Sequence, residues 1–390
     1  MTGKKRIIVM NYFLKRVNKF QEKIREKELD FSIIFNSRHI YYFTGTSQNS
    51  ILLIPKEDSP TLFVRRDFVR AKKESQIKDL VNIHSTSEVL KSIDGFKENE
   101  YNIGIENNFL RVGLFLYLKK YLPTSNFYDV SSIIREMRMI KDDLELEYVR
   151  KSAKVNEEVQ TVSREYLKEG ITELDLAGEI QKVLTENGST FSYFDGYWGR
   201  TPFIIASGEN LWARSDFPPV LSGVGSSPAV PHGPSDREIK KDDIVVVDVA
   251  SVINGYNSDH SRTYYVGKPS DKFKKIYDIL LNARNDGIKN MRAGFKIGDF
   301  CQKIIHSIPK EYHDYIQGYH QFREGFGHGI GLCLDELPML VKNNNRRFKE
   351  NMLIAFEPKI IIPGWGAVNF EDDFIIKKNG PPEQITNSPI

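Results

Sequence analysis

Cysteine is scarce in this sequence, which contains only Cys301 and Cys333 among its 390 residues. Two cysteines exclude a disulfide framework and a cysteine-rich zinc site, and they suit a reducing cytoplasm. Long apolar runs are also lacking, because no segment reaches the roughly 20 apolar residues that a membrane-spanning helix needs. The N-terminal stretch likewise has no apolar core of a signal peptide. We therefore expect a cytoplasmic protein with no membrane partner.

An excess of charge of one sign is missing as well. The formal net charge is +3, and the basic residues are interspersed with acidic ones. Proteins that bind nucleic acid usually carry a basic stripe, so no nucleic-acid partner is expected. What is present is a hydrophobic content of 40% and a charged content of 27%, which is typical of folded globular proteins. The length of 390 residues predicts two or three domains rather than one core.

The first third of the chain predicts an α/β domain. Apolar residues recur at helical spacing over residues 13–27, and three strand-like runs follow at 31–35, 50–55 and 61–66. A long amphipathic helix is then predicted from near Lys141 to Gly170, a residue type that commonly ends helices. We place the domain boundary just before this helix, so the expected domains are residues 1–138 and 139–390.

Two segments of the second domain share one layout of helix, glycine, short loop and new helix. They are residues 164–184 and 289–305, in which Gly170 matches Gly294 and Asp175 matches Asp299. Thr172 with Asp175 is also close to a capping box. A duplicated helical layer over an antiparallel sheet would explain the repeat and would give this α+β domain an internal pseudo-twofold axis. Chance similarity of two helix ends is the alternative.

Two aspartates interrupt the predicted hairpin VVVDVASVINGYNSDHSRTYYVG at residues 245–267. If Asn254-Gly255 forms a two-residue turn, Asp248 faces Ser261, and Asp259 is its diagonal neighbour on the same face. A four-residue loop would instead place the two aspartates directly opposite each other. Either register gathers two like charges on one face, which a cation between them would make tolerable. The alternative is that one aspartate caps a turn or pairs with Arg262.

A second predicted hairpin, at residues 353–376, also carries two acids. Glu357 breaks its first arm and Glu371 its second, and a three-residue loop centred on Gly364 would set them opposite each other. Between the hairpins lies GFGHGIGL, in which glycines flank His328 and allow the backbone to pass close to another segment.

Together these segments supply four carboxylates and one imidazole, more donors than a tetrahedral structural zinc needs. The oxygen-rich set suits two divalent cations: manganese or cobalt is favoured, with iron and zinc as alternatives. Two such ions would activate water and polarise a scissile carbonyl, so the residues predict a metal-dependent hydrolase. The predicted ligands are Asp248, Asp259, His328, Glu357 and Glu371.

Several motifs resemble those of the pita-bread metallopeptidases, which include methionine aminopeptidase, aminopeptidase P and prolidase. The matching segments occur in family order: PHGPSDREIKKDDIVVVDVA, GYNSDHSRTYYVG, GHGIGL, AFEPKI and NFEDDF. The stretch NSRHIYYFTGT at residues 36–46 resembles the N-terminal domain of the prolidase, aminopeptidase P and creatinase branch. The resemblance covers nearly the whole chain and favours that branch over methionine aminopeptidase.

This resemblance implies an α/β N-terminal domain and a pita-bread catalytic domain that cleaves the Xaa-Pro bond of dipeptides or peptide N-termini. Asp248 would chelate one metal ion, while His328 and Glu357 would hold the other. Asp259 and Glu371 would bridge the two ions, and Glu357 would also act as the proton acceptor. A homodimer is expected because homodimers are common in this branch.

Three features depart from the family pattern. Asp335 stands where relatives carry a second histidine, Asn369 stands where many carry an arginine, and the loop before PHG is longer than expected. His232 in that loop is a candidate catalytic or substrate-binding residue, or else an exposed loop histidine. Asp335 could hold a substrate ammonium or merely cap a turn.

These departures leave two alternatives to an Xaa-Pro peptidase. One is the same metal site acting on a small non-peptide amide or a related C–N bond, or in a lyase reaction. The other is a non-catalytic binding module. The segment 206–237 is rich in glycine, proline and serine, and we expect it to be functional or mobile because it is long for a connection.

Overall fold

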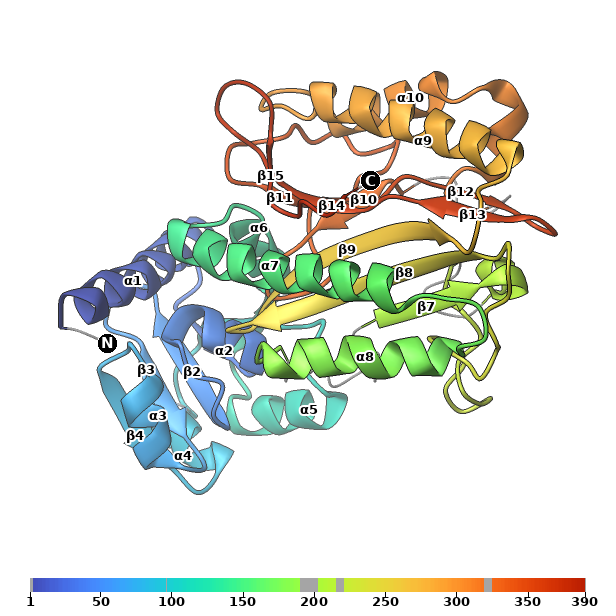
Figure 1. Cartoon of the computed structure of the whole chain (residues 1–390). Coiled ribbons are helices and arrows are strands. Elements are labelled where there is room, and N and C mark those ends of the chain that lie inside the picture. Colours follow the sequence, from blue (N-terminus) through green and yellow to red (C-terminus); the bar gives the residue numbers. More distant parts are fainter. Residues whose placement is uncertain (1–2, 96, 190–202, 215–220, 319–324, 390) are drawn as a thin grey trace. The chain divides into compact units, whose positions relative to one another are not determined.

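The computed structural model describes residues 3–95, 97–189, 203–214, 221–318 and 325–389. It divides into two compact units, Met1–Arg138 and Met139–Ile390 (Figure 1). No helix in the described ranges is long and apolar enough to cross a membrane.

The first unit contains a six-stranded mixed sheet with the strand order β4-β3-β2-β1-β5-β6. The β1–β2 and β2–β3 pairs are antiparallel, and the other three pairs are parallel. All three strand-like runs of the sequence form strands, and they are β1 to β3. The strands are β1 Phe31–Ile34, β2 Ser50–Pro55, β3 Thr61–Val64, β4 Asp79–Asn82, β5 Asn102–Ile105 and β6 Asn126–Asp129.

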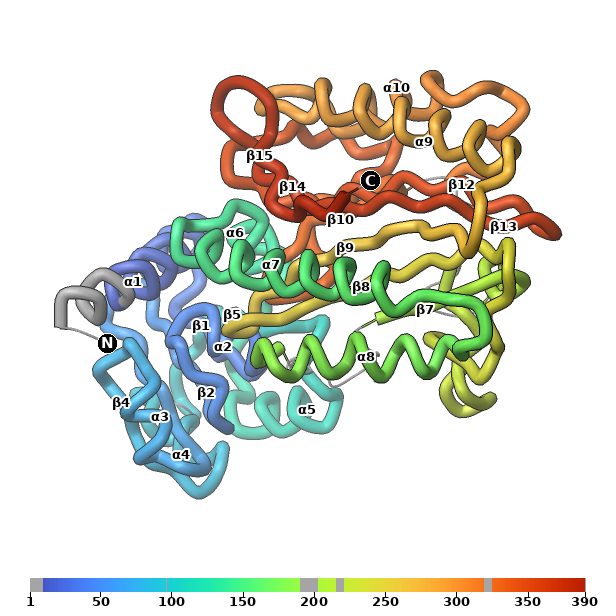
Figure 2. The backbone as a smooth tube through the Cα atoms, viewed as in Figure 1, coloured from blue at the N-terminus to red at the C-terminus, as the bar shows by residue number. Residues whose placement is uncertain are grey.

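Helices accompany this sheet within the described residues of the first unit (Figure 2). The first contains the predicted helical segment and buries Phe13, Val17, Phe20 and Ile24 at helical spacing. The motif at residues 36–46 forms the second, which is capped at its start by Asn36 and at its end by Gly45 in the left-handed region. The helices are α1 Gly3–Glu26, α2 Ser37–Thr44, α3 Phe68–Glu74, α4 Thr86–Lys91, α5 Val112–Tyr121 and α6 Ser131–Arg138.

A buried acid–imidazole pair fixes the start of α2 within this unit. Glu106 is fully buried and accepts hydrogen bonds from the backbone N–H groups of Phe35 (2.7 Å) and Asn36 (2.9 Å). Its other oxygen contacts His39 Nδ1. Burial lowers the pKa of His39 and outweighs the opposite effect of Glu106.

The first half of the second unit is an antiparallel sheet of three strands, flanked by two helices. The strands are β7 Phe203–Ser207, β8 Ile244–Ile253 and β9 Tyr256–Tyr265, and the helices are α7 Asp143–Tyr166 and α8 Glu173–Glu186. The predicted long helix is α7, which starts with a capping box between Asp142 and Glu145. It ends at Tyr166 rather than at Gly170, because Leu167 is already extended and Gly170 turns the chain toward α8.

The second half repeats this plan with shorter strands. A four-stranded antiparallel sheet has the order β10-β11-β14-β15, and β12 pairs with β13 beside it. These strands are β10 Gly327–Gly329, β11 Leu353–Phe356, β12 Lys359–Ile362, β13 Gly366–Asn369, β14 Asp372–Ile375 and β15 Glu383–Gln384. The helices are α9 Asp271–Asn290 and α10 Ile297–Ser307, with short 3-10 turns at η2 Gly208–Trp212 and η3 Lys310–Tyr315.

The repeat predicted from Gly170 and Gly294 is present in the backbone. Both glycines have positive φ, at 89° and 86°. The Gly170 N–H donates to Ile239 and the Gly294 N–H donates to Phe348, and both acceptor residues donate back to the residue after the glycine. Thr172 and Asp175 form the predicted capping box, whereas Lys296 at the equivalent position makes no side-chain cap. The two halves therefore share a fold-level duplication.

Alternation along β8 decides which face carries the candidate site. Val245, Val247 and Val249 pack into the core that includes residues of α7 and α8. Ile244 and Val246 pack into the other core, which includes α9, α10 and the strands of the second half. Asp248 continues the second series, so its side chain faces the second half of the unit.

Candidate metal centre

The two aspartates of the first hairpin share a face in one definite register. Asp248 pairs with Ser261, and Ala250 pairs with Asp259. Asn254 and Gly255 have φ values of 52° and 80°, as a two-residue turn with both central residues left-handed requires. The two-residue alternative is therefore confirmed and the four-residue loop is excluded. The side chain of Asp259 acts on the pKa of Asp248, so the two carboxylates are close neighbours.

The two glutamates of the second hairpin lie at the same level of their register. Within the ladders, Lys359 pairs with Asn369 and Phe356 pairs with Asp372, and both pairs belong to one continuous register. Glu357 and Glu371 fall between these ladders, opposite each other, around a loop centred on Gly364 as the sequence predicted.

The hairpin is interrupted at these acids because their backbone groups bond elsewhere. The Glu357 N–H donates to Phe326 O at 3.0 Å, next to the segment that carries His328. The Glu371 N–H donates to Ser261 O at 3.2 Å, in the strand that carries Asp259. Three segments far apart in the sequence therefore meet at one point.

His328 lies in β10, opposite Ala355 of β11. A Cβ atom at Gly327 would lie 1.9 Å from Ala355 O, and one at Gly329 would lie 2.1 Å from Leu337 O. The predicted close passage of backbones is thus the reason for both glycines. The ring atom His328 Nδ1 donates to Gly329 O at 3.1 Å, which leaves Nε2 as the nitrogen that faces the acids.

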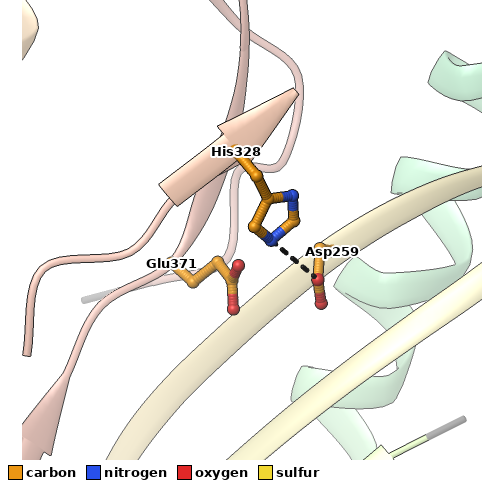
Figure 3. Close-up of side chains that lie close together, drawn as sticks. All are labelled: Asp259, His328 and Glu371. Carbon is orange, nitrogen blue, oxygen red and sulfur yellow. Dashed lines mark ion pairs between the residues drawn. The ribbon is translucent and has the colours of Figure 1, made fainter. Parts of the chain in front are cut away.

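Asp259, His328 and Glu371 converge on one small volume (Figure 3). All three are buried, and one donor atom from each lies within 4.8 Å of the donor atoms of the other two. His328 Nε2 lies 3.9 Å from Asp259 Oδ2 and 3.9 Å from Glu357 Oε1. Asp248 and Glu357 act electrostatically on Asp259 and Glu371, which places both side chains near these three residues.

The electrostatics of the cluster show that it fits divalent cations. Burial, followed by the neighbouring carboxylates, raises the pKa values of Asp259 and Glu371 well above their usual range. Burial also raises the pKa of Asp248 to about 6. Four carboxylates held this close lose solvation and repel one another, and bound cations relieve both costs. Four oxygen donors with one imidazole are a donor set that manganese, cobalt, iron or zinc accepts.

Arg262 does not neutralise the predicted ligands. Its Nη2 donates to Asp372 Oδ1 at 2.8 Å, and its Nη1 donates to the backbone oxygen of Glu371 at 3.0 Å. His260 Nδ1 also donates to that oxygen, at 2.7 Å. The pairing of Arg262 with Asp248 or Asp259, which the sequence left open, is therefore excluded. These side chains hold the backbone of Glu371 in place.

Asp373 supports the cluster from behind and was missed in the sequence. Its Oδ2 accepts hydrogen bonds from Ser258 Oγ at 2.7 Å and from the Asp259 N–H at 3.0 Å. The only signal for it was the pair of acids directly after Glu371 in NFEDDF.

The three predicted substrate contacts differ in their placement. Asp335 Oδ1 lies 3.0 Å from His328 Nε2, beside the cluster. Asn369 is fully buried and donates through Nδ2 to Ser261 Oγ at 2.8 Å. His232 is half-buried, and within the described residues it makes no hydrogen bond or ion pair with the five predicted ligands.

A cation near the cluster was also missed. Lys359 Nζ contacts Glu357 Oε2, and the Lys359 side chain is only 13% exposed. Burial lowers the pKa of Lys359, but the charges of Glu357 and Glu371 raise it by more, so the net shift of the pKa is upward.

Glu173, which was also missed in the sequence, is fully buried in the first turn of α8. Its two oxygens accept hydrogen bonds from Ser207 and Ser235, close to the two ends of the 206–237 segment.

The 206–237 segment is more ordered at its ends than its composition suggested. It begins in the last residues of β7, continues into η2, and is held by the Glu173 hydrogen bonds. The prediction that it is functional or mobile remains a prediction, and residues 215–220 lie outside the described part of the chain.

A duplicated antiparallel sheet, flanked by helix pairs and carrying an acid–imidazole cluster, is the pita-bread fold of metal-dependent hydrolases (Figure 1). Comparison with known proteins gives the family. Residues 147–378 match metallopeptidase family M24, and residues 16–140 match the creatinase/prolidase N-terminal domain. The chain belongs to metallopeptidase family M24.

Relatives and solved structures cover nearly the whole chain. An Xaa-Pro dipeptidase of Pyrococcus horikoshii is 32% identical over 377 residues, which span 95% of this chain and 96% of the relative. The crystal structure of a prolidase from the same organism has a TM-score of 0.81 at 29% identity and covers 96% of this chain and 99% of its own. An Xaa-Pro dipeptidase structure from Bacillus anthracis also has a TM-score of 0.81, at 26% identity, covering 97% and 98%.

Proposed function

We propose that this chain is a dinuclear metal-dependent hydrolase that cleaves the Xaa-Pro peptide bond. The observation that carries the proposal is the convergence of Asp259, His328 and Glu371 within 4.8 Å, joined by Asp248 and Glu357. The names of the relatives, Xaa-Pro dipeptidase and prolidase, supply the substrate class.

In this proposal Asp248 would hold one metal ion, and His328 with Glu357 would hold the other. Asp259 and Glu371 would be shared by both ions. When bound, the ions supply an activated water and polarise the scissile carbonyl. Manganese or cobalt is the proposed metal, because four carboxylates and one imidazole form an oxygen-rich set that both accept.

Glu357 is proposed to move the proton. Its side chain is 19% exposed, so substrate and water can reach it, and its Oε1 faces the cluster 3.9 Å from His328 Nε2. It takes a proton from the attacking water as the C–O bond forms. It returns that proton to the proline nitrogen as the C–N bond breaks, so the products are a free carboxylate and a free imino acid.

The remaining contacts place the substrate. Asp335 is one-third exposed beside His328 and is suited to bind the ammonium group of the substrate. His232 is proposed to contact the substrate from the loop before β8. Asn369 is proposed to act from its buried position next to Ser261, which faces Asp248 across the first hairpin.

We further propose that the two compact units are domains with their boundary between residues 138 and 139. We also propose that the protein works in the cytoplasm as a homodimer. The scarcity of cysteine and the family resemblance support these two points, which size-exclusion chromatography with light scattering and cell fractionation would test.

The function is tested by hydrolysis of Ala-Pro, Met-Pro and Ala-Pro-Ala beside non-proline controls. Each reaction is run with manganese, with cobalt and with a chelator, and beside Asp259→Asn. Metal-dependent cleavage before proline, abolished by the substitution, supports the proposal. A protein that binds two metal ions but cleaves none of these peptides would instead favour a small non-peptide amide. A protein that binds no metal would favour the non-catalytic binding module.

A further inference from the structure

The face of the second hairpin that carries the two glutamates also carries a second pair of polar residues. Glu357 lies opposite Glu371, and the next inward pair of the same register is Lys359 opposite Asn369. The contact of Lys359 Nζ with Glu357 Oε2 shows that the lysine side chain lies on the side of the cluster. The hairpin thus presents two acids at one level and a cation with an amide at the next, nearer the loop tip.

Lys359 differs from a surface lysine in its surroundings. Its side chain is 13% exposed, so its ammonium lies at the margin of the cluster rather than in bulk water. Glu371 and Asp248 act on it together with Glu357. A cation held beside a predicted metal centre repels bound metal ions, and a role of the same charge in binding the substrate would offset this cost. An ammonium has three N–H donors, so the contact with Glu357 Oε2 leaves donors for an anion of the substrate.

The spacing along the hairpin matches the length of a dipeptide. Each residue of a strand advances the chain by about 3.3 Å, so Lys359 lies at most about 7 Å from the level of Glu357 and Glu371. In an Xaa-Pro dipeptide the terminal carboxylate lies one residue beyond the scissile carbonyl, and one residue spans about 3.8 Å between consecutive Cα atoms. A charge-assisted hydrogen bond between this carboxylate and the ammonium adds about 2.8 Å. The two lengths together match the distance from the level of Glu357 and Glu371 to Lys359.

We propose that Lys359 binds the free carboxylate of the proline residue and thereby makes the enzyme a dipeptidase. This inference rests on the proposed cleavage of Xaa-Pro bonds at the level of Glu357 and Glu371. Asp335 on the His328 side supplies a negative charge, so the flanks of the cluster complement the ammonium and carboxylate of a zwitterionic dipeptide. A longer peptide places a neutral amide where Lys359 needs an anion.

The test compares Ala-Pro, Ala-prolinamide and Ala-Pro-Ala with the manganese-loaded wild-type enzyme, Lys359→Met and Lys359→Arg. We expect the wild-type enzyme to prefer Ala-Pro to Ala-prolinamide by about tenfold or more in kcat/KM. Lys359→Met raises KM for Ala-Pro more than KM for Ala-prolinamide and thereby removes this preference, whatever loss of kcat both substrates share through the contact with Glu357. Lys359→Arg keeps the charge and retains part of the preference.

Two controls separate this role from damage to the metal centre. Lys378→Met removes an exposed lysine next to the second hairpin and is expected to behave as wild type. Metal content per chain, measured by mass spectrometry, should be equal in wild type and Lys359→Met. Inhibition by proline but not by prolinamide, lost in Lys359→Met, gives an independent readout of carboxylate binding.

The outcomes distinguish this inference from the proposed function. Equal cleavage of Ala-Pro and Ala-prolinamide by the wild-type enzyme, or an unchanged preference in Lys359→Met, overturns the role of Lys359 and leaves Xaa-Pro cleavage standing. Cleavage of Ala-Pro-Ala in preference to Ala-Pro does the same. Failure of the metal-loaded wild-type enzyme to cleave any of the three overturns both.

Discussion

Glu173 and Ser235 are joined by two hydrogen bonds to one carboxylate oxygen: Glu173 Oε2 accepts from the Ser235 N–H at 2.9 Å and from its Oγ at 2.7 Å. The other oxygen, Oε1, accepts the N–H and Oγ of Ser207 at 2.8 and 2.7 Å. Ser207 ends β7 and Ser235 follows His232 by three residues. One buried acid of α8 therefore closes the base of the segment that carries His232.

Glu173→Gln is expected to loosen this segment without emptying the metal centre. The amide would place N–H groups against serine donors, and an unsatisfied buried donor costs about 1–3 kcal/mol. We expect faster amide exchange over residues 221–237 and a higher KM, with metal content unchanged. Glu186→Gln, at the exposed end of α8, is the matched control. Unchanged exchange and KM would show that the Glu173 contacts do not position the loop.

Removal of metal is expected to lower the thermal stability of the protein. The cluster acids have raised pKa values when no cation is present, so bound cations stabilise the folded state. At a free metal concentration of 100 times Kd, the gain is about 2.7 kcal/mol. The check is a Tm titration with manganese after chelation. Asp259→Asn should lose most of the rise, and an equal rise in both proteins would place the binding elsewhere.

Asp372→Asn is expected to be strongly destabilising. Asp372 is fully buried and pairs with Arg262 and Arg284, so burial raises its pKa but the two guanidinium groups lower it further. Removing its charge leaves two buried cations without their partner, which costs about 3–5 kcal/mol. Urea unfolding measures the loss.

Asp286→Asn controls for the loss of an acid that pairs on the surface, with Lys289. Exposed pairs contribute about 0–1 kcal/mol, so this variant should unfold near the wild-type midpoint. Similar unfolding midpoints for Asp372→Asn and Asp286→Asn would contradict the role of the Arg262–Asp372–Arg284 cluster.

His39 predicts a pH dependence of local stability in the first unit. Its pKa is lowered by burial from 6.5, so the folded state keeps it neutral while the unfolded chain takes up a proton. The stability linked to His39 is therefore fully present above pH 6.5 and falls as the pH drops below that value. Amide exchange over residues 31–45, corrected for intrinsic rates, measures this loss.

In His39→Gln the loss of protection below pH 6.5 should be smaller, because glutamine does not titrate. His84→Gln changes an exposed histidine of the same unit and should keep the wild-type profile. Identical profiles in all three proteins would rule out His39 as the titrating group.

The sequence predicted the hairpins well because strand alternation and turn chemistry are local. Asn254-Gly255 and Gly364 determine both registers, and the registers place each pair of acids on one face. The glycines around His328 predicted a close passage, although not its partners, Ala355 and Leu337.

The residues that the sequence did not reveal depend on contacts between distant segments. In the sequence Glu173 is indistinguishable from an ordinary acid in the first turn of a helix. The four hydrogen bonds that it accepts from serines come from Ser207 and Ser235, which lie 34 and 62 residues further along the chain. In the sequence Lys359 looks like a charged residue at the start of an apolar strand. Its contact with Glu357 at the margin of the cluster is visible only in the folded structure. The end of α7 was also misplaced, because Gly170 serves the following turn rather than the helix.

The shared register of β11–β14 and β12–β13 limits how this region can vary. Glu357 and Glu371 each lie seven positions from Gly364, the centre of the loop. A one-residue insertion in either arm would turn the side chains beyond it to the opposite face of the hairpin. A one-residue insertion in both arms would keep the pairing but would put the pairs beyond it on the opposite face as well. Length variation in this part of the chain is therefore expected only at the loop tip, where added residues leave both arms in register.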